Sequence, residues 1–434
     1  MNDLLSKIEE KTANIAVIGL GYVGLPLAVD FAKAGFHVVG IDKNQARANA
    51  VDNGRNYIGD VSDDDLKTVT KNGRLTGTTD FSVLQQTDAI CICVPTPLSK
   101  TKDPDVSFIL HATDAVHQHL RSQQLICLES TTYPGTTHEL VLPRLSRTGL
   151  TVGKDFFLSF SPERIDPGNA HFKLKNTPKV IGGTTPACLK LSEALYGNIV
   201  DHVIPVSSTE AAEMVKLLEN TFRSVNIGLV NEMAIMAQKL GLDVWEVIHA
   251  ASTKPYGFMP FYPGPGLGGH CIPVDPHYLA WKLKTLNYKA RFIEMAGEIN
   301  AAMPQYVVDL IVGGLNQNKK SVNGSNILVL GLSYKKDIAD TRESPALDII
   351  TILQTQGANI SWNDPYVSDY PTTPAPTFVK NLTPSALSAT DCVVIVTDHS
   401  SYDWASIVAN ATLVIDTRNA TKDVQCPSGR VLKL

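Results

Sequence analysis

Short apolar runs alternate with amphipathic segments near both ends of the 434-residue chain, a pattern typical of parallel sheets with helices between the strands. In the N-terminal part, the pattern predicts strands at 15–18, 37–41, 88–94, 125–128 and 156–160 and helices at 25–34 and 62–70. In the C-terminal part it starts again, with strands at 327–330, 359–362, 392–397 and 413–415 and a helix at 344–356. The sequence therefore predicts an α/β protein with two doubly wound domains.

A long helical segment, 208–240, is predicted between these domains, and a second one follows at 292–313. The first would span roughly 45 Å, and its apolar positions cover most of its circumference, which predicts burial between domains or subunits. On it, Lys216, Asn220 and Arg223 form one polar stripe, either a solvated face or the lining of a site. We predict three parts: 1–207, 208–316 and 317–434.

Glycines follow the first predicted strand in the pattern of a dinucleotide-binding turn. Gly19, Gly21 and Gly24, with Tyr22 and Val23 between them, form GxGxxG directly before a helix, and the next strand ends on Asp42. Such a turn brings the backbone to a pyrophosphate, and the carboxylate accepts the ribose hydroxyls. An isolated GxGxxG can be an ordinary turn, but this context predicts a Rossmann-like NAD site. Asp42 would repel the extra phosphate of NADP, whereas Lys43 and Arg47 would attract it.

Polar residues at the ends of other predicted strands are candidate ligand contacts. Thr96 and Thr131 are candidate cofactor contacts or simple turn caps, and Glu163 beside Arg164 is a candidate site or an ordinary ion pair. In the second domain the glycine spacing is degraded, so we predict binding of a nucleotide phosphate but not of a dinucleotide. Lys335 and Arg418 would hold the phosphate or pyrimidine there, unless they are surface charges.

The segment 263–278, PGPGLGGHCIPVDPHY, places Cys271 in a predicted glycine-rich loop, with Asp275 four residues later. Glycines allow a substrate carbon close to the sulfur, and a thiolate is a strong nucleophile toward an aldehyde. Most unpaired cysteines are small buried apolar residues. Here the setting favours a catalytic nucleophile.

Composition limits the other classes of function. The net charge of −5 gives no bulk attraction for nucleic acid, no apolar run is long enough for a membrane span, and the polar N-terminus predicts a cytoplasmic protein. The seven cysteines show no CxxC pair and no metal-ligand spacing, so we predict no metal site.

Seven separated segments, in order, resemble the UDP-glucose/GDP-mannose dehydrogenase family: GLGYVGLPLA, ESTTYPG, SPERIDPGN, AEMVKLLEN, GPGLGGHCIPVDP, YKKDIADTRESPA and DTRN. The resemblance covers nearly the whole chain. It implies two Rossmann-like domains joined by a long central helix, oxidation of a nucleotide sugar at C6 with two NAD, and a homodimer or higher homo-oligomer. Arg164, Ile165 and Val274 differ from the Phe-Leu pair and the lysine of UDP-glucose enzymes, and the segments are similar to the N-acetylhexosamine branch, which implies UDP-N-acetyl-D-glucosamine as the substrate.

The resemblance also implies residue roles. Cys271 would be the nucleophile, Lys216 and Asn220 would hold the oxyanion, Lys216 or an Asp275-bound water would take the first proton, Glu163 would be the acid/base of thioester hydrolysis, and Thr131 would position water. The implied NAD contacts are Gly19, Gly21, Tyr22, Val23, Gly24, Asp42, Arg47, Thr96, Thr131 and Arg342. The implied UDP-sugar contacts are Arg164, Ile165, Lys216, Asn220, Arg223, Phe258, Tyr262, Gly268, Tyr334, Lys335 and Arg418.

Three other functions stay open at this point. The same chemistry on UDP-N-acetylmannosamine, UDP-N-acetylgalactosamine or UDP-glucose differs only in the sugar. A catalytically silent nucleotide-sugar regulator would not need the set Cys271, Lys216, Glu163 and Asp275. A two-electron hydroxyacid dehydrogenase would have no use for the cysteine segment or for a second nucleotide fold.

Overall fold

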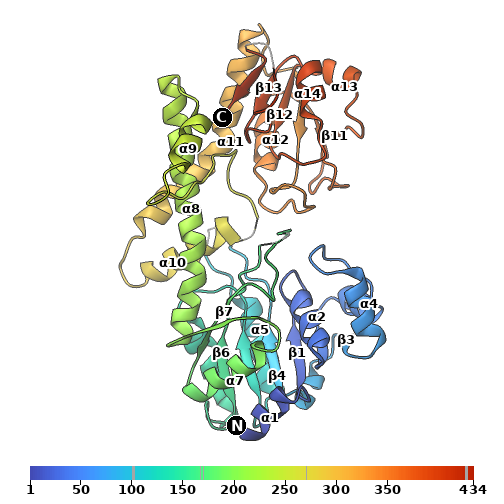
Figure 1. Cartoon of the computed structure of the whole chain (residues 1–434), viewed down its shortest axis with the longest axis vertical. Helices are drawn as coiled ribbons and strands as arrows, with labels where there is room; N and C mark the ends of the chain where they lie inside the picture. The colour runs from blue at the N-terminus through green and yellow to red at the C-terminus, as the bar shows by residue number, and fades with distance from the viewer. Residues whose placement is uncertain (100–102, 167, 170, 270, 426–428) are drawn as a thin grey trace. The chain divides into compact units, whose positions relative to one another are not determined.

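The computed structural model describes residues 1–99, 103–166, 168–169, 171–269, 271–425 and 429–434. The chain divides into two compact units (Figure 1). Unit 1 comprises 1–219 and 277–288, and unit 2 comprises 220–276 and 289–434. The three-part division predicted from the sequence remains a prediction.

Unit 1 contains an eight-stranded sheet in the order β3-β2-β1-β4-β5-β6-β7-β8. Its strands are β1 (Asn14–Ile18), β2 (His37–Ile41), β3 (Leu75–Thr78), β4 (Ala89–Ile92), β5 (Leu125–Leu128), β6 (Phe157–Phe160), β7 (Lys179–Gly183) and β8 (Val203–Val206). All neighbours pair parallel except β6 and β7, which are antiparallel. The first six strands follow the order of a dinucleotide-binding sheet, with the switch point between β1 and β4.

Helices cover both faces of this sheet, which explains why its strands are apolar on both sides. The helical segments of unit 1 are α1 (Asn2–Glu9), α2 (Gly24–Ala34), α3 (Gln45–Asp52), α4 (Asp63–Lys71), η1 (Phe81–Gln86), α5 (Ser107–His119), η2 (Thr137–Val141), α6 (Leu142–Leu145), η3 (Ser146–Thr148) and α7 (Pro186–Tyr196). One core joins α1, α2, α4 and α7 to odd-numbered β1 residues such as Ile15 and Val17. The other core joins α5 and α6 to the alternate residues Ala16 and Ile18.

Unit 2 repeats this architecture with a six-stranded parallel sheet in the order β11-β10-β9-β12-β13-β14. Its strands are β9 (Asn326–Leu330), β10 (Asn359–Asn363), β11 (Thr377–Phe378), β12 (Cys392–Ile395), β13 (Val414–Asp416) and β14 (Val431–Lys433). Its other helices are α9 (Val244–Ser252), α11 (Arg291–Gln317), α12 (Pro345–Thr355), α13 (Pro384–Ser388) and α14 (Trp404–Asn410). Helices α11 and α12 pack on one face, and α13 and α14 on the other. The predicted pair of doubly wound Rossmann-like folds is therefore confirmed.

The long central helix is α8 (Thr209–Leu240), within a residue of its predicted start. Several of its apolar positions are exposed in the single chain, so their predicted burial between domains or subunits remains a prediction. Leu217 and Val230 are buried, but Leu218 and Leu229 are 60% and 53% exposed, because the packed elements of the chain cover only part of the helix circumference.

The cysteine lies at the start of a helix and not inside a loop. Helix α10 (Cys271–Lys284) begins at Cys271 and contains Pro276. A proline in the first turn removes an N–H that has no partner within the helix, so Pro273 is compatible with this start. The predicted loop therefore ends before the sulfur, and His270 lies outside the described residues.

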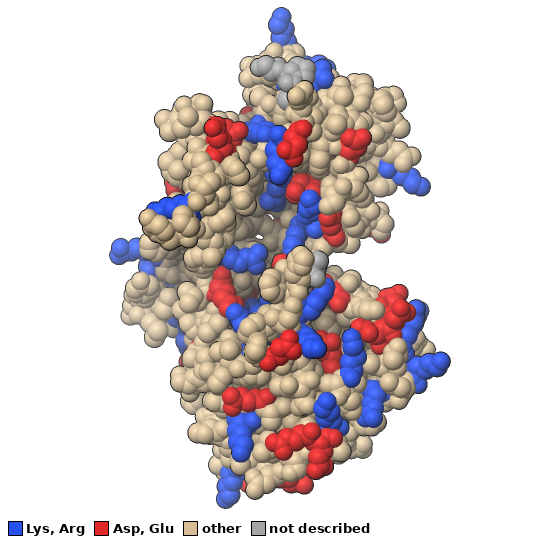
Figure 2. Space-filling view, in the orientation of Figure 1, with Lys and Arg blue, Asp and Glu red and all other residues tan. Residues whose placement is uncertain are grey.

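No helix in the described part of the chain combines the length and the apolar character that crossing a membrane requires. In the lower part of Figure 2, which shows one face of unit 1, basic and acidic side chains are interspersed.

Candidate functional site

The glycine turn after β1 has the backbone geometry of a dinucleotide cradle. Gly19 has a φ of +94°, and a Cβ there would lie 2.6 Å from the carbonyl oxygen of Cys93. A Cβ at Gly24 would lie 1.8 Å from the carbonyl oxygen of Gly19, whereas one at Gly21 would meet no heavy atom within 4 Å. Gly19 and Gly24 are therefore required for the tight turn and for helix packing, and Gly21 leaves open space where a pyrophosphate approaches.

Asp42 follows β2 and is 6% exposed. Its carboxylate accepts N–H bonds from Leu20 at 3.0 Å and from Asn44 at 2.8 Å, and Arg47 Nη1 lies 3.6 Å from its Oδ2. The bond from Leu20 holds the carboxylate against the glycine turn, which is the place of the acid that accepts ribose hydroxyls. These residues fit NAD.

The other predicted cofactor contacts fall into two groups. Thr96 and Thr131 are buried and follow β4 and β5 in unit 1, at the carboxyl edge next to β1, while Tyr22 is exposed at the start of α2. Arg342 belongs to unit 2, where its guanidinium pairs with Asp340 at 2.6 Å.

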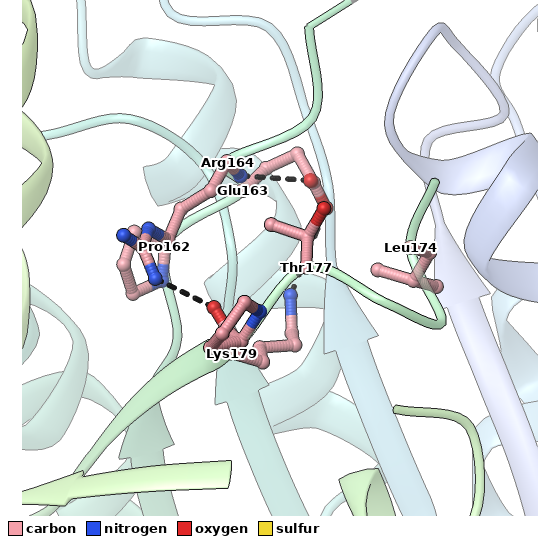
Figure 3. Close-up of a pocket in the computed structure, with 7 residues that line it drawn as sticks. Pro162, Glu163, Arg164, Leu174, Thr177 and Lys179 are labelled. Carbon is pink, nitrogen blue, oxygen red and sulfur yellow. Dashed lines mark hydrogen bonds and ion pairs between the residues drawn. The ribbon is translucent and has the colours of Figure 1, made fainter. Parts of the chain in front are cut away.

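A small pocket lies beside Glu163 in unit 1 (Figure 3). It is lined by Pro162, Glu163, Arg164, Leu174, Thr177, Pro178 and Lys179. Glu163 Oε1 accepts the backbone N–H groups of Arg164 and Ile165, both at 2.7 Å. These two bonds turn the carboxylate back over its own loop and hold it at the pocket wall.

The guanidinium of Arg164 pairs with Glu219, and not with Glu163 as in the ion pair that the sequence left as an alternative to a site. Its Nη2 and Nε donate to the Glu219 carboxylate at 2.6 and 3.3 Å, and Nη1 donates to the Pro178 carbonyl oxygen at 2.6 Å. A guanidinium has five N–H donors, so two remain for a ligand.

Behind Glu163, a charged pair is fully enclosed by unit 1. Lys179 Nζ lies 2.8 Å from Glu129 Oε2, and the Tyr196 hydroxyl donates to Glu129 Oε1 at 2.5 Å. Burial alone would lower the pKa of Lys179, but the carboxylates of Glu129 and Glu163 raise it above its ordinary value. The pattern of apolar strands carried no signal for this pair, because its two members lie fifty positions apart at the ends of different strands.

In unit 2, the cysteine segment brings a thiol, an amide and a carboxylate to neighbouring positions. Cys271 is exposed at the first position of α10, where the unpaired N–H groups of a helix favour a thiolate. One turn later, buried Asp275 accepts a bond from Asn220 Nδ2 at 2.5 Å. Two of the predicted catalytic residues are thus joined directly.

The glycines before Cys271 make room for side chains from the second sheet. A Cβ at Gly268 or Gly269 would lie 2.4 or 2.8 Å from the Tyr334 side chain, and one at Gly264 would lie 2.6 Å from Arg418 Nη1. The segment around the cysteine therefore packs directly on Tyr334 and Arg418, two of the predicted UDP-sugar contacts.

The remaining predicted site residues have these positions. Lys335, next to Tyr334 in the sequence, is half-buried. Phe258 and Tyr262 are both exposed, and the Tyr262 ring stacks on Trp245 with 6.1 Å between the ring centroids. Arg223 is exposed on α8. Lys216 is buried on α8 within unit 1. The polar stripe of α8 thus changes from buried to exposed along the helix, and it is not uniformly solvated.

In the second sheet, the acid after β10 already has hydrogen-bond partners. Asp364 Oδ2 accepts the N–H groups of Leu332 and Ser333 at 2.7 and 2.9 Å and lies 3.1 Å from His399 Nε2. Its other oxygen accepts two further backbone N–H groups. Asp364 therefore braces the β9 turn, and the prediction that this copy does not bind a dinucleotide remains a prediction.

Comparisons with known proteins cover both units. The chain matches three models of the UDP-glucose/GDP-mannose dehydrogenase family: the NAD binding domain over 13–200, the central domain over 210–302 and the UDP binding domain over 328–423. It is 36% identical to UDP-N-acetyl-D-glucosamine 6-dehydrogenase of Pseudomonas aeruginosa over 90% of this chain and 92% of that protein.

Two further comparisons involve Pyrococcus horikoshii. UDP-N-acetyl-D-mannosamine dehydrogenase of that organism is 36% identical over 94% of this chain and 96% of its own. A solved structure of a UDP-D-ManNAc dehydrogenase from the same species superposes with a TM-score of 0.88 at 35% identity, covering 97% of this chain and 98% of that one. Together with the NAD cradle and the cysteine segment, these matches show that the chain belongs to the UDP-glucose/GDP-mannose dehydrogenase family, as an NAD-dependent nucleotide-sugar dehydrogenase.

Proposed function

We propose that this protein oxidises UDP-N-acetyl-D-glucosamine at C6 to UDP-N-acetyl-D-glucosaminuronate, a precursor for surface polysaccharide. The observation that carries the four-electron chemistry is the placement of Cys271 at a helix N-terminus, one turn before the Asp275–Asn220 pair. Oxidation that stops at the aldehyde has no need of a nucleophilic thiol. Oxidation of an alcohol to a carboxylate through a thioester needs a stage in which the substrate is covalently bound to the thiol.

In the first half of the reaction, Lys216 or a water bound to Asp275 takes the proton of the C6 hydroxyl. NAD, held by the glycine turn and Asp42, would accept one hydride in each half of the reaction. The Lys216 ammonium and the Asn220 amide then stabilise the negative charge that develops on the C6 oxygen.

In the second half, the Cys271 thiolate adds to the aldehyde carbon, and loss of the second hydride leaves a thioester. Thr131 positions water, and Glu163 removes its proton as the water attacks the thioester carbonyl. The C–S bond breaks, the thiolate returns to Cys271, and the product leaves as a carboxylate.

The nucleotide is assigned to unit 2. Tyr334, Lys335 and Arg418 belong to 328–423, which matches a UDP binding domain, and Tyr334 and Arg418 both border the glycine segment before Cys271. We propose that their aromatic and cationic groups bind the uracil and the diphosphate, since planar guanidinium and ammonium groups suit phosphate oxygens.

The choice of sugar is tested with a panel of UDP-sugars. Arg164 retains two N–H donors near Glu163, and an N-acetyl carbonyl would accept from them, whereas UDP-glucose would leave them unpaired at a cost of roughly 1 to 3 kcal/mol. We expect NADH release with UDP-N-acetyl-D-glucosamine to exceed that with UDP-glucose by about tenfold or more in kcat/KM. UDP-N-acetyl-D-mannosamine and UDP-N-acetyl-D-galactosamine complete the panel, and product mass identifies the uronate.

Two variants separate recognition from a structural ion pair. Arg164→Leu should reduce the preference for UDP-N-acetyl-D-glucosamine over UDP-glucose, mainly by lowering kcat/KM for the acetylated substrate. Glu219→Gln removes the ion-pair partner of Arg164 but keeps the guanidinium, so it should largely preserve this preference. Equal losses in both variants on both substrates would show that Arg164 only holds α8 to its loop. A wild-type preference for UDP-glucose would refute the assignment of the sugar.

We also propose that the protein acts as a homodimer or higher homo-oligomer. Five apolar side chains of α8 recur at spacings that place them on one helix face, and each is between 40% and 72% exposed: Phe222, Leu229, Met233, Met236 and Leu240. An exposed apolar stripe of this length is typical of a surface covered by a second copy.

Sedimentation measures this assembly. Wild type should sediment at a multiple of 47.0 kDa, and Leu229→Asp should shift it toward the monomer because a charge would be buried at the contact. Lys239→Asp, on the same helix but off the stripe, is the matched control. A monomeric wild type at micromolar concentration would contradict the proposal.

A further inference from the structure

Lys179 is a buried cation whose position is not explained by packing. It is the first residue of β7, its side chain is 2% exposed, and its ammonium contacts the Glu129 carboxylate, which follows β5, at 2.8 Å. The ammonium also lies 5.0 Å from the ring centroid of Tyr196. Buried ion pairs of this kind are often no more stabilising than apolar residues of similar volume, so stability alone is a weak reason for the pair.

The same ammonium faces the proposed acid/base of the reaction. Lys179 Nζ lies 3.7 Å from Glu163 Oε2, and the Glu163 side chain is only 9% exposed. The other carboxylate oxygen, Oε1, accepts the N–H groups of Arg164 and Ile165. Glu163 is therefore held between two backbone donors and one cation, which together fix the orientation of its carboxylate.

We propose that Lys179 is a positioning residue that keeps the Glu163 carboxylate oriented toward the pocket, with Glu129 and Tyr196 fixing the ammonium in place. The inference rests on the proposed function, in which Glu163 takes a proton from the water that hydrolyses the Cys271 thioester. In that step the water oxygen bonds to the carbonyl carbon, the C–S bond breaks and the proton passes to Glu163. In this proposal Lys179 acts through the Glu163 carboxylate and not on the substrate itself.

Other charged and titratable groups surround this cluster within unit 1. Asp30 on α2 acts on Glu163 through its charge, and Cys127 on β5 acts on Lys179. On the pocket side, Arg164 and Glu219 form an ion pair, so a positive and a negative charge lie next to each other there. Among these described groups, Lys179 is the cation that lies 3.7 Å from Glu163 Oε2, so its removal should disturb the position of that carboxylate most.

Three variants test the proposal in single-turnover reactions with substrate and excess NAD. Lys179→Met removes the cation but leaves Glu129 buried and unpaired, which can prevent folding. Lys179→Met combined with Glu129→Gln removes both charges and keeps an acceptor for Tyr196. Lys179→Arg restores the cation. Thermal unfolding and circular dichroism establish that each variant is folded before kinetics are compared.

The expected result is a defect confined to hydrolysis. Both Met-containing variants should release NADH within about threefold of the wild-type rate but lose carboxylate formation by about tenfold or more, the lower part of the range for a disabled general base. Intact-protein mass should show an acyl group accumulating on Cys271. The pH profile of hydrolysis should change because a cation beside Glu163 is removed, and Lys179→Arg should restore both the rate and the pH profile.

A purely structural role predicts something different. If the folded double variant slows NADH release and thioester hydrolysis equally, Lys179 is not a positioning residue. The same conclusion follows if that variant hydrolyses the thioester at the wild-type rate with an unchanged pH profile. Failure of the proposed function itself would appear in wild type, as one NADH per sugar and no acyl group on Cys271 under any condition. The two failures are therefore distinguishable in the same experiment.

Discussion

Replacing Cys271 with alanine is expected to abolish carboxylate formation while leaving NAD binding unchanged. The sulfur is the proposed nucleophile, and loss of a nucleophile that acts as part of a catalytic unit costs about a thousandfold or more. The glycines that contact the cofactor belong to unit 1, whereas Cys271 belongs to unit 2, so the cofactor site does not depend on the thiol. Uronate is measured by mass, and NAD affinity by titration of the apoenzyme.

Cys392 gives a matched control. It is buried in β12, where burial raises the pKa of its thiol, so Cys392→Ala should leave uronate formation intact apart from a loss of stability. Cys271→Ser adds a second check: an alkoxide is a poorer leaving group than a thiolate, so the ester should persist. Wild-type rates of uronate formation in Cys271→Ala would rule out the thioester mechanism.

Replacing Glu163 with glutamine is expected to slow thioester hydrolysis by about 10²- to 10⁴-fold, the range for loss of a general base. Gln has nearly the same shape and keeps an oxygen to accept the N–H groups of Arg164 and Ile165, so the loop should stay in place. NADH should then appear in a burst of one turnover, with the acyl group retained on Cys271. Quenched-flow chromatography measures the burst, and intact mass measures the acyl-enzyme.

The control for Glu163→Gln is Glu139→Gln. Glu139 is also a carboxylate of unit 1, paired with Lys282 at 2.6 Å and 48% exposed, but it has no proposed part in the reaction. It should change the rate of hydrolysis little. If Glu163→Gln hydrolyses the thioester at the wild-type rate, another residue is the base, and the inference about Lys179 fails with it.

The architecture of the protein was largely predictable from the sequence. Apolar runs of four or five residues report burial on both faces of a sheet, and the strand, glycine turn, helix and acid of 15–42 specify a dinucleotide site within one local segment. The second sheet was recognisable in the same way, even with its glycine spacing degraded. These features are local, so no knowledge of distant contacts was needed to find them.

The local state of the cysteine was not predictable in the same way. Glycines and prolines around Cys271 indicated a loop, but α10 begins at the cysteine and continues through Pro276. Packing can override helix propensity. Pro273 lies in the first turn, where its missing N–H has no partner within the helix, whereas Pro276 removes one hydrogen bond from the helix interior. The apolar circumference of α8 likewise suggested burial, whereas part of it is exposed in the chain.

What the sequence determined by itself was therefore the two folds and the cofactor turn, because each depends on neighbours within a few positions; the reactive residues that it indicates remain proposals. Only the tertiary structure decided which charges act on which. The ammonium of Lys179 meets Glu129 and Glu163, and Arg164 meets Glu219, through strand order and helix packing that join positions 16 to 55 residues apart. Electrostatic interactions depend on distance and burial in space, and neither quantity is written in the order of residues along the chain.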